Sequence, residues 1–100
     1  MAHFAKVDLH GKDLSGSNMA GANFKEANLS GANFTDADLS GAIFDGANLE
    51  GTNLDRANLE NASLVGANLR AASLRSAILK VASLQRAVLE QTDLEGAEVT

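Results

Sequence analysis

The sequence lacks cysteine, proline, tryptophan and tyrosine, and its only aromatic residues are four phenylalanines. The absence of Cys excludes disulfides and Cys-based zinc sites. The absence of Pro removes the commonest breaker of regular backbone structure. With so few large side chains among 100 residues, the core of so small a domain must be built from small units that repeat regularly.

The sequence also has little positive charge and no long apolar run. Its formal net charge is −5, which argues against nucleic-acid binding because phosphate contacts need a surplus of Lys and Arg. No segment approaches the roughly 18 apolar residues of a membrane span, and the opening MAHFAKVDLHGKD lacks the apolar stretch of a signal peptide. We therefore expect a single cytoplasmic domain over residues 1–100, without direct contact to nucleic acid or membrane.

What the sequence does contain is a period of five. Every fifth residue is apolar, without insertion or deletion. We call these the centre positions: Phe4, Leu9, Leu14, Met19, Phe24, Leu29, Phe34, Leu39, Phe44, Leu49, Leu54, Leu59, Leu64, Leu69, Leu74, Leu79, Leu84, Leu89, Leu94 and Val99. The inward residue two before each centre is Ala, except at Val7, Lys12, Ser17, Thr52 and Thr92. The residue between the two is usually Asn, Asp or Ser. We give a repeat this complete more weight than any local pattern of secondary structure.

This period fits neither a helix nor a flat strand. In an α-helix five residues turn about 500°, so successive centres would scatter around the axis. In a flat strand an odd period sends successive centres to opposite faces. A chain that turns a corner in every repeat points each centre, and the residue two before it, to the same side. The sequence therefore predicts a β-solenoid with these residues inside.

The number of repeats in one coil follows from columns of residues that would stack at about 4.8 Å. A separation of twenty residues stacks opposite charges, in the columns Glu50–Arg70–Glu90, Asp55–Arg75–Glu95, Glu60–Lys80 and Lys25–Asp45. A separation of fifteen would instead place Asp45 beside Glu60. We therefore predict about five coils of four repeats, with a core ladder formed by Phe4, Phe24, Phe44, Leu29, Leu49, Leu69, Leu39, Leu59 and Leu79.

The repeats resemble those of the pentapeptide repeat family, whose motif reads Ala, then Asp or Asn, then Leu, then two variable residues. The motif stands here as Ala27-Asn28-Leu29, Ala37-Asp38-Leu39, Ala47-Asn48-Leu49, Ala57-Asn58-Leu59 and Ala67-Asn68-Leu69, among others. The resemblance covers almost the entire chain and implies a right-handed quadrilateral β-helix. It also implies that the centre residue and the residue two before it face the interior.

The resemblance leaves three hypotheses for function. Most members of the family have no assigned activity and none is an enzyme through its repeats, which favours a non-enzymatic scaffold or protein–protein interaction module. One branch protects DNA gyrase by imitating duplex DNA with a long acidic rod, so a DNA-mimicking gyrase modulator is the second hypothesis. This chain is shorter than those proteins, has no insertion loop and carries banded charge. The third hypothesis is a purely structural fragment of a longer repeat chain.

Candidate catalytic or metal-binding residues are few. His3 and His10 are the only histidines, both in the first coil and without a clustered partner. Carboxylates on a convex rod have no cleft that would shield a perturbed pKa, and Asp36 and Asp38 lack the glycine-rich loop of calcium-binding solenoids. No phosphate loop, nucleophile elbow or zinc spacing is present. We expect no enzyme activity, no cofactor and no metal.

The residue after each centre forms a ring around every coil in this register. The third ring is acidic, the fourth mostly basic and the fifth acidic again: Asp45, Glu50, Asp55 and Glu60; Val65, Arg70, Arg75 and Lys80; Gln85, Glu90, Glu95 and Thr100. Such bands fit a protein partner of complementary charge. They also avoid like-charge columns between stacked coils, and we take this structural role as the default.

Apolar residues at outward positions are candidate interaction residues: Ile43, Val65, Ile78, Val81 and Val88. We single out Ile78, Val81 and Val88 as a candidate interaction or self-association patch. The stretch LRAASLRSAILKVASLQRAV also spaces apolar residues as on one helix face, which leaves a capping helix as an alternative there. Ala77-x-Leu79 and the repeats after it keep the solenoid register.

The two ends of an open solenoid expose unpaired strand edges and usually need a cap or a partner. In the first coil Lys12 takes an inward position, and we expect it to reach out to solvent. The last coil carries carboxylates that would repel an identical end: Glu90, Asp93, Glu95 and Glu98. We therefore predict a homo-oligomer formed through a coil end or through the Ile78–Val81–Val88 patch.

Overall fold

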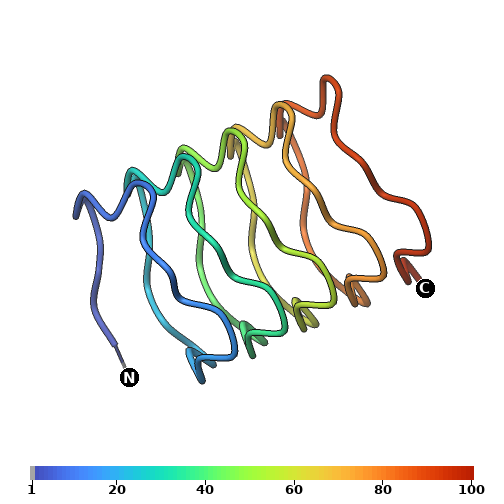
Figure 1. The fold of residues 1–100 in the computed structure, drawn as a ribbon, viewed down its shortest axis with the longest axis horizontal. Coiled ribbons are helices and arrows are strands. Elements are labelled where there is room, and N and C mark those ends of the chain that lie inside the picture. The colour runs from blue at the N-terminus through green and yellow to red at the C-terminus, as the bar shows by residue number, and fades with distance from the viewer. Residues whose placement is uncertain (1) are drawn as a thin grey trace.

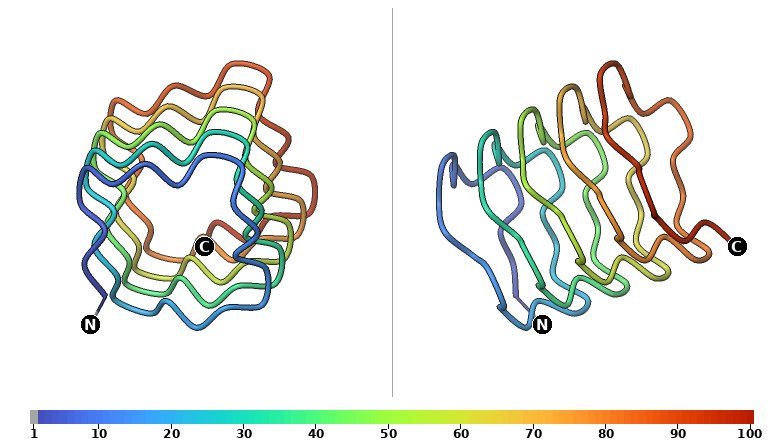
Figure 2. Two further views of the ribbon diagram at one scale, coloured as in Figure 1. Left: turned by 60° about the vertical axis from the view of Figure 1, so that its left-hand side comes forward. Right: turned by 45° about the vertical axis from the view of Figure 1, so that its right-hand side comes forward.

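The computed structural model describes residues 2–100 and shows a rod of coils stacked along one axis (Figure 1). Sixteen parallel bridges join residues twenty positions apart, from His3 with Asn23 to Ile78 with Glu98. Seen nearly end-on, each coil is a square with four sides, and the two ends of the chain lie at opposite ends of the rod (Figure 2). The predicted right-handed quadrilateral β-helix, with four repeats in each coil, is confirmed.

Each side of a coil is a segment of three residues rather than a long strand. The four sides of the first coil are residues 2–4, 7–9, 12–14 and 17–19, and the pattern recurs every twenty residues. The middle residue of a side forms the bridge, and the centre residue donates its N–H to the next coil, as Leu59 does to the Ile78 carbonyl at 2.8 Å. Residues 2–100 contain no helix, so the capping-helix alternative for residues 69–88 does not occur.

A corner of two residues joins consecutive sides. After Phe24, the N–H of Ala27 donates to the Phe24 carbonyl at 3.0 Å, and the second corner residue, Glu26, has a φ of 59°. A positive φ at this place is typical of a type II turn, which favours Gly. All nine glycines of the chain occupy second corner positions. Ten other residues, among them Val81, take the same backbone conformation, which L-residues rarely adopt.

The core is formed by the centre and inward residues of the second, third and fourth coils. Every centre from Phe24 to Leu79 is 3% exposed or less. In the core ladder only Phe4 is partly buried, because a coil covers it on one side alone. Among residues 2–100, Thr52 is the one buried polar residue, and its hydroxyl donates to the Leu49 carbonyl at 2.8 Å. The interior is therefore filled, with its polar atoms hydrogen-bonded.

The four phenylalanines pack together in the N-terminal half of this interior. Phe24 stacks on Phe4 with ring centroids 5.2 Å apart, and on Phe44 at 5.0 Å. Phe34, which comes from the opposite side of the square, meets Phe24 and Phe44 edge-on at 5.8 and 6.1 Å. Aromatic pairs in these geometries contribute about 0.5–1.5 kcal/mol beyond their buried area.

Candidate interaction surface

The fold does not bring the candidate patch of Ile78, Val81 and Val88 together. Ile78 lies half-buried on the fourth side of the fourth coil, between its bridge partners Asn58 and Glu98. Val81 stands at the next corner and is 75% exposed. Val88 is 42% exposed on the second side of the fifth coil, which faces away from the fourth side. Ile78 and Val81 are neighbours, and Val88 belongs to a different face.

Apolar surface gathers instead at the C-terminal end of the rod. Leu89, Leu94 and Val99 are centre residues of the fifth coil, and they are 41%, 38% and 64% exposed. Their side chains point into the coil like every other centre, but no coil of the described chain covers them. The sequence pattern contains this signal, because a centre residue in a terminal coil has a stacking neighbour on one side only.

The first coil is the more polar end. Val7 and Lys12 take inward positions but are exposed, as expected for Lys12. Ser17, the third inward exception of this coil, donates its hydroxyl to the Leu14 carbonyl at 2.6 Å. The centres of this coil pack against the core and are partly buried: Phe4, Leu9, Leu14 and Met19.

Ion pairs between neighbouring coils form in only part of the predicted charge columns. Arg70 contacts Glu50 at 3.1 Å, and Arg75 contacts Glu95. Lys80 lies 3.9 Å from Glu98 and forms no ion pair with Glu60. Since all these side chains are exposed, each pair contributes about 0.2–1 kcal/mol.

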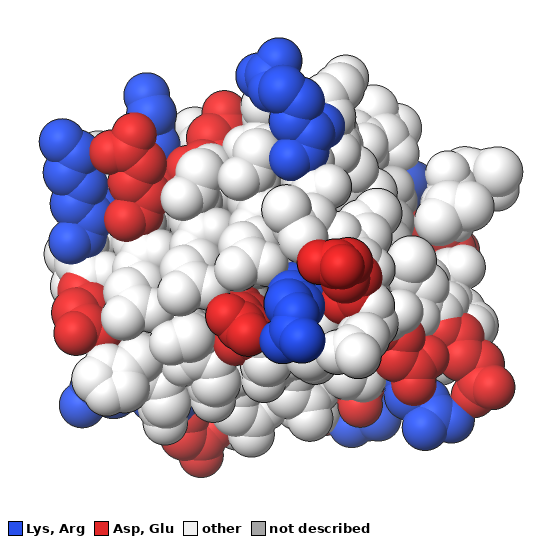
Figure 3. Space-filling model, turned by 90° about the horizontal axis from the view of Figure 1, so that it is seen from above, with Lys and Arg blue, Asp and Glu red and all other residues white. Residues whose placement is uncertain are grey.

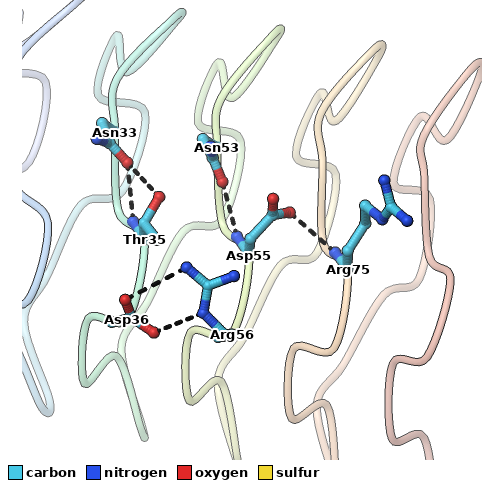
Figure 4. Close-up of polar contacts among 7 residues, drawn as sticks. All are labelled: Asn33, Thr35, Asp36, Asn53, Asp55, Arg56 and Arg75. Atoms are coloured by element: carbon cyan, nitrogen blue, oxygen red, sulfur yellow. Dashed lines mark hydrogen bonds and ion pairs between the residues drawn. The ribbon is translucent and has the colours of Figure 1, made fainter.

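A further column is formed by second corner residues, which the sequence pattern did not single out. Arg56 contacts Asp36 in the coil before it at 2.9 Å (Figure 4). This hydrogen bond raises the pKa of Arg56. Lys6 lies 3.9 Å from Glu26 at another corner. Charges at the corners therefore link successive coils along more columns than predicted.

The acidic ring of the third coil is largely without ion-pair partners. Among residues 2–100, Glu50 forms an ion pair, whereas Asp45, Asp55 and Glu60 form none. Figure 3 shows acidic and basic side chains interspersed over one face of the rod. The middle of the rod therefore carries three exposed or half-buried carboxylates that no ion pair within residues 2–100 neutralises.

Two of these carboxylates stand at corners of the side of the rod that carries an exposed apolar residue. Ile43 is 37% exposed on the first side of the third coil, and Asp45 occupies the corner that follows it. Ser63 forms the bridge with Ile43 and donates its hydroxyl to Asp45. Glu60 stands at the corner that leads into the segment of Ser63. Ile43 therefore has Asp45 at the corner that follows its own segment, and Glu60 at the corner that precedes the stacked segment of Ser63.

Outward Asn and Asp residues cap the corners that follow them. Asn33 accepts hydrogen bonds from both the N–H and the hydroxyl of Thr35, the first of them at 3.0 Å (Figure 4). Ser73 takes the place of Asn in its repeat, and Asp55 of the coil before it supplies the acceptor instead. Its carboxylate accepts the Ser73 hydroxyl and the Arg75 N–H, the latter at 3.0 Å. The corners are thus held by local side-chain acceptors or by acceptors one coil away.

Hydrogen bonds of the same kind shift pKa values in the first coil. The hydroxyl and the N–H of Ser15 lower the pKa of Asp13. Contact with His10, whose ring nitrogen lies 2.7 Å from the carboxylate, lowers the pKa of Asp8. All four side chains are exposed, and each shift has a local structural cause.

The described residues offer no enclosed site. Over residues 2–100 the structure has no pocket and no group of three or more His, Asp or Glu side chains placed to hold a metal ion. In the same range no helix has the length and apolarity needed to cross a membrane. His10 forms its ion pair with Asp8, and neither histidine belongs to a group that could hold a metal ion within residues 2–100.

Comparison with known proteins agrees with this architecture. The family model for pentapeptide repeats matches residues 2–41, 32–70 and 42–80, with 8 copies of the repeat. None of the curated proteins is similar enough to this chain to count as a relative.

Several solved structures are similar to this one. A pentapeptide repeat protein from the thylakoid lumen of Arabidopsis thaliana is 35% identical with a TM-score of 0.91, over 94% of this chain and 66% of that protein, just under two thirds of its length. Rfr23 from the cyanobacterium Cyanothece 51142 is 30% identical with a TM-score of 0.47, over 93% of this chain and 87% of that one. A trypsin-treated variant of QnrB1, a plasmid-mediated fluoroquinolone resistance protein, is 24% identical with a TM-score of 0.55, over 95% and 59%. The repeat pattern, the square coil and the family match together show that the chain belongs to the pentapeptide repeat family.

Proposed function

We propose that this chain is a non-enzymatic pentapeptide repeat module that binds a protein partner through the first side of its third coil. The observation that supports the proposal is the exposure of Ile43 beside the corner of Asp45, with Glu60 at the corner before the stacked segment of Ser63 and neither carboxylate in an ion pair within residues 2–100. An apolar centre with a charged rim is the usual composition of a protein interface. The partner that fits it presents an apolar side chain with Lys or Arg residues beside it.

The rest of the molecule supports an interaction role on the outside of the rod. Its interior is occupied by packed centre residues from Phe24 to Leu79. Its outer residues are held in fixed columns by parallel pairing from coil to coil. A net charge of −5 adds long-range attraction for a basic partner, which speeds association at low salt.

The test has two stages. Partners captured from the source cells by the immobilised chain are first identified and purified. Their affinity is then measured by calorimetry for the natural chain, for Ile43→Ser, and for the double variant Asp45→Asn with Glu60→Gln. Glu90→Gln is the matched control, because Glu90 is a corner carboxylate outside this side that forms no ion pair within residues 2–100.

We expect both test variants to weaken binding and the control to leave it unchanged, with affinity falling as salt rises. Affinities that respond to neither variant nor salt would contradict the proposed surface. The location in the cytoplasm stays a prediction, since the similar Arabidopsis protein comes from the thylakoid lumen.

The gyrase hypothesis receives no support from the surface. Duplex DNA is uniformly negative, whereas the acidic third ring is followed by a ring with Arg70, Arg75 and Lys80. The likeness to QnrB1 lies under 25% identity and concerns the fold alone. In a gyrase supercoiling assay with and without quinolone we expect no effect of the chain, and protection of gyrase would favour DNA mimicry over the proposed partner binding.

A further inference from the structure

The C-terminal end of the rod presents an unused hydrogen-bonding edge. In the inner coils each centre N–H donates to a carbonyl in the next coil, as Leu59 does to Ile78. Within the described chain the corresponding N–H groups of the fifth coil have no backbone acceptor: Leu84, Leu89, Leu94 and Val99. The carbonyls of the inward residues are also without a donor there: Ala82, Ala87, Thr92 and Ala97. Such an edge is a template for another chain.

The N-terminal end presents the complementary edge. In inner coils the middle residue of a side, such as Asn23, offers its carbonyl to the coil before it and donates its N–H to that coil, here to Ala2. In the first coil these carbonyls and N–H groups have no backbone partner in the described residues: His3, Asp8, Asp13 and Asn18. The four centre N–H groups and four inward carbonyls of one end therefore match the four carbonyls and four N–H groups of the middle residues on the other. Corner N–H groups, which also donate to the next coil as Gly66 does to Gln85, add further donors to the C-terminal end.

We propose that a second copy of this chain docks head-to-tail, with its first coil on the fifth coil of the first copy. Because the chain advances by one coil in each turn, each end of the rod is a helical surface and not a flat one. Two such ends match only when the second copy continues the helix of the first. In that register the apolar centres continue their columns, with Leu89 under Leu9, Leu94 under Leu14 and Val99 under Met19 of the second copy. The exposed end surface of the fifth coil, up to 64% at Val99, then becomes interior.

Charge selects this arrangement over a tail-to-tail pair. The fifth coil carries Glu90, Asp93, Glu95 and Glu98 against one cation, Arg86, so two such ends would repel each other. The first coil balances Lys6 and Lys12 against Asp8 and Asp13, and it also holds both histidines. Head-to-tail docking stacks Glu90 under His10 of the second copy, which is an attractive pair when the imidazole is protonated.

The same register makes two unfavourable contacts, and these make the docking testable. Arg86 comes under Lys6 of the second copy, and Asp93 comes under Asp13. Like charges directly opposite each other destabilise strand pairing. We therefore expect weak association that strengthens with salt, because salt screens both repulsions. A head-to-tail contact does not close on itself, so growth continues beyond the dimer.

Arg86→Glu separates the two orientations. In the head-to-tail dimer the change turns the repulsion between residue 86 and Lys6 of the second copy into an attraction. In a tail-to-tail dimer it adds a negative charge to two ends that are already acidic. Arg86 forms no ion pair within residues 2–100, and no atom lies within 4 Å of a Cβ placed at Gly66, its column neighbour in the fourth coil, so little is lost in the single copy. We expect the association constant to rise about two- to ten-fold, the range given by one or two exposed charge contacts.

The measurement is sedimentation equilibrium over a range of protein and salt concentrations. The natural chain should show a mass that rises with concentration, Arg86→Glu a steeper rise, and Val99→Asp a monomer, since the change places a carboxylate on the docking end. Circular dichroism confirms that each variant is folded. A monomeric mass for both the natural chain and Arg86→Glu, or a limiting dimer that Arg86→Glu weakens, would overturn the proposal. This docking is independent of the partner surface around Ile43, because the two lie on different coils.

Discussion

Asp55 and Arg75 lie twenty residues apart, and the carboxylate of Asp55 accepts the backbone N–H of Arg75 at 3.0 Å. Within the repeat of Asp55, the side-chain oxygen of Asn53 accepts the backbone N–H of Asp55 at 2.9 Å. Ser73 stands in the place of Asn one coil further on, and its short side chain donates to Asp55 instead. A missing local cap is therefore replaced by a residue of the neighbouring coil.

Removal of this cap should cost stability, and a second change should restore it. In Asp55→Ala the Ser73 hydroxyl and the Arg75 N–H lose their acceptor, which we expect to lower the free energy of unfolding by about 1–2 kcal/mol at about 0.5–1.5 kcal/mol for each hydrogen bond. Addition of Ser73→Asn supplies an amide oxygen to the Arg75 N–H and should recover most of the loss. Urea denaturation measures the free energy of unfolding of both variants, and an unchanged midpoint in Asp55→Ala would argue against the cap.

Val81 should be a source of strain at its corner. Its φ is 60°, and a β-branched residue is unfavourable in this conformation by about 1–3 kcal/mol. Because Val81 is 75% exposed, Val81→Gly removes little packing, and we expect it to raise stability by about 1 kcal/mol after the larger entropy of an unfolded Gly is counted.

Gly41 provides the matched control for that prediction. It occupies the same column, has a φ of 69° and has no atom within 4 Å of the place where a Cβ would stand. Gly41→Val should therefore destabilise through backbone strain alone, by about 1–3 kcal/mol. Equal thermal stability of Gly41→Val and the natural chain would mean that these corners tolerate side chains without strain.

Leu59 tests the inward direction of the centre residues. It is fully buried, so Leu59→Asp places an unpaired carboxylate in an apolar interior, and we expect loss of the folded middle coils. Leu59→Met conserves the volume and should cost less than about 1.5 kcal/mol. Thermal melts followed by circular dichroism compare the two variants. A Leu59→Asp variant as stable as Leu59→Met would contradict the inward placement.

Asp13 should make stability depend on pH in acid. Its folded pKa lies below its ordinary value because Ser15 donates two hydrogen bonds to the carboxylate. A lowered folded pKa stabilises the fold above the ordinary pKa of about 3.9, and this contribution is lost as the pH falls further through the folded pKa. NMR titration should show the pKa of Asp13 rising towards its ordinary value in Ser15→Ala. In Asp13→Asn, which keeps an acceptor and cannot titrate, the acid loss of stability should be smaller.

The sequence specifies the coil because only one backbone geometry buries every centre. Centres such as Phe24 and Leu59 belong to one series spaced five residues apart, and only a coil that turns at every repeat points the whole series inward. The stacking of Phe24 on Phe44 follows from the same register. The opposite placement of Ile78 and Val88 also follows from it, since ten residues are half a coil. The apolar residues at outward positions near the C-terminus predicted a single patch, and the square geometry divides it.

The chemistry of the corners was not predicted, because it depends on local backbone angles and rotamers. The positive φ of Glu26 explains why Gly is the commonest residue at second corner positions, but the apolar pattern gives no indication of it. Lys80 follows Glu60 in its column, but the carboxylate that it contacts belongs to Glu98 in the next coil. The column register limits which charged side chains can meet, but it does not determine which of them form an ion pair.

Because one repeat forms one side of the square, insertion or deletion of a whole repeat has a simple structural effect. Loss or gain of five residues keeps every inward residue inward, but it turns all later residues by a quarter of the square. A deletion of one repeat ahead of Val88 would move that residue from the second side to the first, into line with Ile43 and Ser63. New combinations of outward residues are thus reached in single steps while the interior keeps its pattern, so the outer surface of this rod can diversify faster than its core.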